Sequence, residues 1–169
     1  TLLFTLMSAM EESEETGEGF VFPGDFLVID EAHTLENIAA RQLGMRVSQA
    51  GIMFNLRRLY NPGKKRGLFQ VVRHPEGVQR VTALGDAVEE FFDDIRGACE
   101  FNQWGGEYRV REREFIEDTL AEDFLALERE VKVAADKVSA DLTRAELLDL
   151  GRRISQSRVA IDCFLQQAE

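Results

Sequence analysis

The sequence predicts a mainly α-helical protein in which a helical unit is attached to a fragment of an α/β domain. Apolar residues recur at helical spacing through most of residues 34–60, 76–101 and 115–168. One short apolar run, residues 26–29, has the composition of a buried strand and leads directly into two carboxylates. With 44% hydrophobic and 30% charged residues, the composition is that of a globular protein. No apolar run approaches the roughly 20 residues that a membrane helix needs.

The residues with the clearest chemistry follow this strand-like run. Pro23-Gly24-Asp25 supplies a turn before it, and parallel sheets bind ligands beyond the carboxyl ends of their strands, where Asp30 and Glu31 would lie. In nucleoside-triphosphatases with a phosphate-binding loop, the first carboxylate after such a strand holds magnesium, and the second can orient or activate the attacking water. A plainer interpretation is that both carboxylates favour the positive end of a following helix, with Thr34 as its N-cap.

The sequence Val28-Ile29-Asp30-Glu31-Ala32-His33, followed by Thr34-Leu35-Glu36-Asn37-Ile38-Ala39, resembles motif II of the DinG/XPD-like DEAH helicases of superfamily 2, their Walker B element. Leu2-Leu3-Phe4 is similar to the Leu-Leu-rich helix upstream of that motif in the family. The resemblance implies that residues 1–45 are a fragment of a RecA-like motor domain with the Walker B strand. It also implies that residues 46–169 are a helical arch-like domain, because the family has its arch directly after motif II.

The resemblance implies a role for each polar residue of the motif. Asp30 would hold magnesium, Asp30 and Glu31 would bind the nucleotide cofactor, and Glu31 would act on the water that attacks ATP. His33 would couple the nucleotide site to neighbouring motifs. ATP and magnesium are thus the implied cofactors of the intact protein, and its implied partners are single-stranded or forked DNA and the remaining helicase domains. Hydrolysis of ATP would drive movement along single-stranded DNA and opening of a duplex.

Other parts of such an enzyme are missing from the sequence. No Gly-x-x-x-x-Gly-Lys-Ser/Thr phosphate loop occurs, so we expect the isolated chain not to hydrolyse ATP. Many relatives in the resembled family carry a four-cysteine iron–sulfur domain upstream of motif II, but Cys99 and Cys163 alone cannot assemble a cluster. These two distant cysteines indicate buried thiols in a reducing cytoplasm. His33 and His74 lack metal-ligand partners at useful spacing. Because the chain opens at Thr1 without a signal peptide, we expect a piece of a longer cytoplasmic protein.

The elements around the motif are predicted in order. Residues 2–10 have apolar side chains on more than one face, as in a helix buried beside a sheet. Residues 11–19 form an acidic loop. Residues 34–43 have helical spacing, and Gly44 follows where a C-cap glycine belongs.

A second helix is expected to begin after the N-cap Ser48 and to continue through Tyr60. Asn61-Pro62-Gly63 ends it, and Lys64-Lys65-Arg66-Gly67 is a loop. Residues 68–72 fit either a short strand or a helical turn. The apolar stripe of the helix predicts core residues at Ile52, Met53, Leu56 and Leu59 or Tyr60.

A long amphipathic helix is predicted over residues 76–101, with Gly85 as a weak point. Residues 107–112 alternate well enough for a short edge strand. From Phe115 the pattern is helical to the end of the chain, and Thr143-Arg144-Ala145-Glu146 fits a capping box that starts the last helix. The two stripes expected to be buried are Phe124, Leu127, Val131, Ala134, Ala135 and Val138, then Leu147, Leu150, Ile154, Val159, Ile161 and Leu165.

Charge is distributed unevenly along the chain, whose net charge is −11. Residues 1–45 carry −8 and residues 81–169 carry −10, whereas residues 46–80 carry +7. A basic island of this kind is a candidate contact for DNA phosphates, and its plainer interpretation is a solvated surface that balances nearby acidic helices. The candidates for nucleic-acid contact are Arg57, Arg58, Lys64, Lys65, Arg66 and Arg73, with Arg80 next along the chain.

Two other functions remain open. One is a non-enzymatic helical interaction module in which Asp30-Glu31-Ala32-His33 occurs by coincidence. The other is a fragment of an RNA helicase of the DEAH-box type. That alternative is weaker, because the residues after His33 lead into a helix as in the DinG/XPD-like class and a large helical segment follows.

Overall fold

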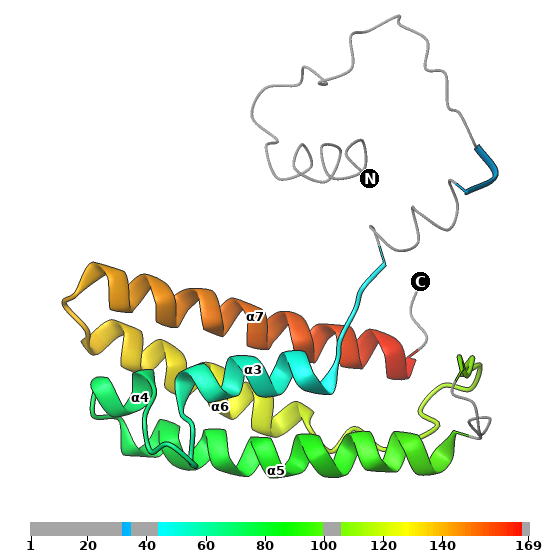
Figure 1. Cartoon of the computed structure of the whole chain (residues 1–169), viewed down its shortest axis with the longest axis horizontal. Coiled ribbons are helices and arrows are strands. Elements are labelled where there is room, and N and C mark those ends of the chain that lie inside the picture. The colour runs from blue at the N-terminus through cyan, green and yellow to red at the C-terminus, as the bar shows by residue number, and fades with distance from the viewer. Residues whose placement is uncertain (1–31, 35–43, 100–105, 167–169) are drawn as a thin grey trace, which may run out of the picture. The chain divides into compact units, whose positions relative to one another are not determined.

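The structure, a computed structural model, describes residues 32–34, 44–99 and 106–166. The chain divides into two units, Thr1–Arg46 and Val47–Glu169. In the first unit the described residues include one short 3₁₀ helix, η1, at Ala32–Thr34. The remaining described helices all belong to the second unit (Figure 1).

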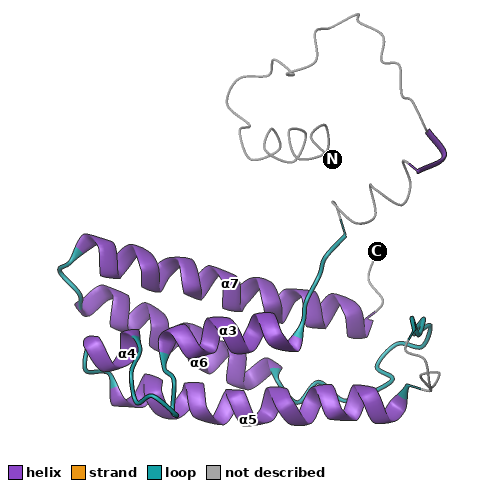
Figure 2. Ribbon diagram, in the orientation of Figure 1, coloured by secondary structure: helices purple, strands orange, loops and turns teal. Residues whose placement is uncertain are grey.

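The prediction of a mainly α-helical protein is confirmed. The described residues contain no β-strand, and Figure 2 shows only helices and connecting loops among them. None of their helices is long and apolar enough to cross a membrane. The described part of the second unit has five α-helices: α3 (Gln49–Leu59), α4 (Leu68–Val71), α5 (Pro75–Ala98), α6 (Ala121–Lys137) and α7 (Asp141–Gln166).

The four longer helices of the second unit form an antiparallel bundle. α3 packs on α5 and α7, and α6 packs on the same two helices. Successive long helices run in opposite directions along the unit (Figure 1). Each long helix therefore buries one apolar face against two neighbours, as expected for a four-helix bundle. The short α4 lies in the connection between α3 and α5 and packs against both helices.

Apolar side chains three or four residues apart fill the centre of this bundle. The predicted stripes of α3 and α6 supply many of them, and α5 adds Val81, Leu84, Val88 and Phe91. α7 follows its predicted stripe except at Val159, which is 40% exposed beside the buried Ala160 and Ile161. Deleting a large side chain from such a core costs about 2–5 kcal/mol. The largest fully buried side chains are Phe69, Phe91, Phe124, Leu56, Leu59, Leu84, Leu120, Leu127, Leu147, Leu150, Ile154 and Ile161.

Several predicted helix boundaries agree with the structure. Ser48 caps α3, since its hydroxyl oxygen accepts a hydrogen bond from the Gly51 backbone N–H at 3.1 Å. The undecided residues 68–72 contain the helix α4. Pro75 occupies the first position of α5, where its fixed φ suits a helix and no backbone N–H is needed. α5 continues through the buried Gly85 to Ala98.

Three local predictions were wrong. Residues 107–112 form no strand, because no second strand lies beside them in the described part of the chain to accept their backbone hydrogen bonds. The helix expected from Phe115 begins only at Ala121, after the Asp118 carboxylate accepts hydrogen bonds from the Leu120 and Ala121 backbone N–H groups. These bonds turn the chain into α6.

The predicted capping box at the start of the last helix was also wrong. α7 already begins at Asp141, and the Arg144 backbone N–H donates to the Ala140 carbonyl at 3.0 Å, so Thr143 lies inside the first turn. The carboxylate of Glu146 accepts a hydrogen bond from Arg58 of α3 instead. The predicted helix at 2–10, the acidic loop, the strand at 26–29 and most of the helix at 34–43 lie outside the described residues.

Candidate nucleic-acid interface

The residues of the motif are only partly described. Asp30 and Glu31 lie outside the described residues, so their magnesium and nucleotide roles stay predictions. His33 lies in η1 with an exposed side chain. Within the residues that the structure describes, no group of three or more His, Cys, Asp or Glu side chains is arranged to hold a metal ion. Cys99 is buried and Cys163 is half-buried, both as free thiols.

Part of the basic island comes together at one end of the bundle. A pocket of about 620 Å³ opens between α3, the loop of residues 60–67, α4 and the first turns of α7. Four of the predicted contact residues line it, namely Arg57, Arg58, Lys64 and Arg66. The remaining lining residues are Phe54, Asn61, Gly67, Leu68, Val71 and Glu146.

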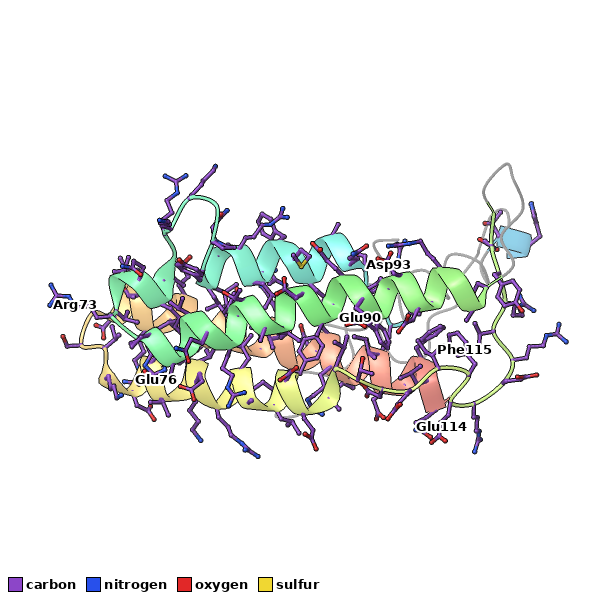
Figure 3. All side chains as sticks on the ribbon, turned by 90° about the horizontal axis from the view of Figure 1, so that it is seen from below. Arg73, Glu76, Glu90, Asp93, Glu114 and Phe115 are labelled. Carbon is purple, nitrogen blue, oxygen red and sulfur yellow. The ribbon has the colours of Figure 1, made fainter. Side chains whose placement is uncertain are left out.

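The other predicted contacts lie elsewhere. Lys65 is exposed on the same loop, in a left-handed backbone conformation with φ 48°, but does not line the pocket. Arg73 follows α4, also with a positive φ of 54°, and its side chain points away from the helices at one end of the unit (Figure 3). Arg80 is exposed on α5 and is likewise absent from the pocket wall.

A short turn presents the cations of the loop. The Asn61 side-chain oxygen accepts a hydrogen bond from the Lys64 backbone N–H at 3.0 Å, and the Asn61 backbone N–H donates to the Arg66 carbonyl at 2.8 Å. Gly67 then brings the chain back against the end of α3. At its φ of 156°, an added Cβ would lie 2.4 Å from the Leu59 carbonyl oxygen, so only glycine fits this close approach.

One carboxylate faces this group of cations. Nη2 of Arg58 lies 2.6 Å from Oε1 of Glu146, and this half-exposed pair ties α3 to α7. Elsewhere in the part of the chain that the structure describes, no carboxylate forms an ion pair with Arg57, Lys64 or Arg66. The pocket therefore has more positive charge than its own acidic residues neutralise.

Two arginines of α7, in contrast, are neutralised by a carboxylate of their own helix. Asp149 accepts hydrogen bonds from Arg152 at 2.9 Å and from Arg153 at 2.8 Å. Hydrogen bonds from Arg152 and then Arg153 hold the pKa of Asp149 below its ordinary value. These two cations are already paired within their own helix, unlike Arg57, Lys64 and Arg66 of the pocket.

Sequence reasoning missed the buried polar contact behind α4. His74 is 5% exposed, and its Nε2 atom lies 2.6 Å from a carboxylate oxygen of Glu130 on α6. The Phe69 ring of α4 lies beside the imidazole, with ring centroids 5.5 Å apart. The ion contact joins the residue before α5 to α6, and the Phe69 ring packs α4 on the same imidazole. A histidine before a helix-starting proline is a weak signal, and no spacing rule points to a partner 56 residues away.

Two apolar side chains at the pocket are exposed. Phe54 of α3 is 62% exposed and Val71 of α4 is 72% exposed, and both line the pocket beside the cations. Phe54 lies outside the apolar stripe that α3 buries. A large aromatic residue on the polar face of a predicted helix is the sequence signal that could have identified it. Comparisons of the chain with family models, with curated proteins and with solved structures gave no match.

Proposed function

We propose that this chain is a segment of an ATP-dependent DNA helicase of the DinG/XPD-like kind, with motif II followed by a helical arch-like domain. The observation that carries the proposal is the sequence of residues 28–39, in which Asp-Glu-Ala-His follows a strand-like apolar run and leads into a helical pattern. The helical bundle α3–α7 downstream of the motif and the cations gathered at one end of it support the assignment.

In this proposal residues 1–45 belong to a RecA-like motor domain, and the two carboxylates of the motif have separate roles. Oxygen ligands are the donors that magnesium prefers, and Asp30 would hold the ion, largely through water. Glu31 orients the attacking water and accepts its proton. His33 transmits the state of the nucleotide site to neighbouring motifs. The phosphate loop and the second motor domain come from other parts of the intact, cytoplasmic protein.

Substitution of the two carboxylates in the intact protein tests this assignment. Glu31→Gln should retain ATP binding and lower turnover by about a hundredfold or more, because general-base help is removed. Asp30→Asn should instead raise the magnesium concentration needed for hydrolysis. Glu18→Gln, in the acidic stretch before the motif, is the matched control and should leave turnover unchanged. Steady-state ATP hydrolysis that both motif variants leave unaltered would reject the Walker B assignment.

The same preparation separates the two alternative functions. A non-enzymatic helical module would show no hydrolysis of ATP that depends on Glu31. An RNA helicase would hydrolyse ATP faster with single-stranded RNA than with single-stranded DNA, whereas the proposed DNA helicase shows the reverse order.

A further inference from the structure

We propose that the pocket between α3, α4 and the loop of residues 60–67 is a subsite for one unpaired nucleotide of single-stranded DNA. The base would lie against Phe54, and the flanking phosphates would contact Lys64 and Arg66. This inference rests on the proposed function for the choice of DNA as the nucleic acid. It adds a place on the helical unit where an unpaired base is held.

Charge complementarity indicates an anionic occupant. Four cationic side chains and one carboxylate line the pocket, in a chain whose net charge is −11. The single carboxylate, Glu146, is already paired with Arg58 at 2.6 Å. Arg57, Lys64 and Arg66 remain to neutralise phosphates. Contacts of this kind release counterions from the nucleic acid, so binding must weaken as salt rises.

The exposed aromatic ring distinguishes a nucleotide from a simple anion. Phe54 is 62% exposed, whereas the buried side chains Ile52, Leu56 and Leu59 of the same helix are at most 2% exposed. Phe54 lines the pocket together with the cations. Proteins that bind single strands combine a positive groove with aromatic rings on which bases stack. A volume of about 620 Å³ lies within the range of small-ligand sites, roughly 300–1,000 Å³.

The same geometry selects an unpaired strand. A base inside a duplex is stacked on both faces, so it presents no face to Phe54 unless it leaves the stack. A duplex can still contact Lys64 and Arg66 through its phosphates. We therefore expect the subsite to prefer single-stranded over double-stranded DNA, and we expect this preference to depend on Phe54.

Anisotropy titrations of a labelled oligothymidylate with the intact protein, without ATP and across a range of salt concentrations, test the inference. Phe54→Ala should weaken binding roughly 5- to 150-fold at constant salt and leave the salt slope unchanged, since stacking carries no charge. Phe54→Trp should restore the affinity. Lys64→Ala with Arg66→Ala should reduce the salt slope by about 0.7 for each phosphate that the protein no longer neutralises.

Two control variants match these changes. Leu142→Ala removes another exposed apolar side chain, and Lys132→Ala with Lys137→Ala removes two exposed lysines of α6. Each control should alter affinity less than twofold. The inference is overturned if Phe54→Ala binds as tightly as the unchanged protein, if duplex DNA of equal length binds equally well, or if vesicles with anionic lipid compete as effectively as the oligonucleotide.

The DNA-binding test of the subsite and the ATP-hydrolysis test of the helicase motif can succeed or fail separately. Binding that depends on Phe54, with ATP hydrolysis that does not depend on Glu31, would support the subsite and reject the helicase. Hydrolysis that depends on Glu31, with binding indifferent to Phe54, would support the helicase and reject the subsite.

Discussion

At the scale of single residues, the contact between His74 and Glu130 is the clearest polar support of the bundle. The imidazole is 5% exposed, and Nε2 lies 2.6 Å from the Glu130 carboxylate. A second carboxylate, of Glu76, lies farther away, 3.8 Å from Nδ1. Loss of Glu130 would therefore leave a buried ring nitrogen without its close partner, and such groups are costly to leave unpaired.

We predict that Glu130→Ala lowers the free energy of unfolding by about 1–3 kcal/mol. Glu89→Ala, on the exposed face of α5, is the control and should change it by less than about 0.5 kcal/mol. Urea denaturation followed by circular dichroism measures both values. Equal midpoints for the two variants would show that the contact contributes nothing to stability.

The basic residues show how far sequence reaches at this scale. Net charge along the chain identified the island, and four of its members do line one pocket, Arg57, Arg58, Lys64 and Arg66. The sequence alone did not show that Lys65 and Arg73 lie outside the pocket. Both have a positive φ in the structure, and this local backbone conformation cannot be read from neighbouring residues in the chain. The partners Glu146 and Glu130 come from distant helices, so only the folded bundle reveals them.

At the scale of elements, periodicity predicted the helices well because the same pattern that forms them also buries them. The apolar stripes of α3, α5 and α6 are the walls of the core. The failures were short patterns with weak burial. Residues 107–112 alternate between apolar and polar residues but have no neighbouring strand in the described structure. Thr143-Arg144-Ala145-Glu146 has the sequence of a capping box but does not form one, since the Glu146 carboxylate accepts a hydrogen bond from Arg58.

Two glycines of α5 lead to opposite predictions for the same substitution. A Cβ at Gly77 would lie 2.7 Å from the Phe69 ring and 2.8 Å from the His74 ring, both buried. A Cβ at Gly85 would meet only the end of Met53, at 3.9 Å. Gly85→Ala should therefore stabilise the protein by about 0.5–1 kcal/mol through reduced backbone entropy of the unfolded chain. Gly77→Ala should destabilise it by about 1–3 kcal/mol through overpacking.

Thermal and urea unfolding of both variants check this pair. Each variant serves as the control for the other, because the substitution and the helix are the same. A shift of both midpoints in one direction would contradict the packing around the first turns of α5.

At the scale of the whole molecule, fold and function rest on different observations. The mainly α-helical architecture follows from the helical spacing of the apolar residues, which lets each helix bury one face. The proposed activity rests on twelve residues, 28–39, whose carboxylates precede the described bundle. The pocket at the end of the bundle is a separate observation that favours an anionic partner, because its cationic side chains outnumber its carboxylates.

Unwinding of a forked DNA duplex by the intact protein is the most direct test of the helicase assignment. With ATP and magnesium present, we predict strand separation that requires hydrolysable ATP and is lost in Glu31→Gln, although that variant still binds the nucleotide. Addition of single-stranded DNA should accelerate ATP hydrolysis by the unchanged protein. Intact protein that neither separates the fork nor responds to single-stranded DNA would contradict the assignment of this chain to a DNA helicase.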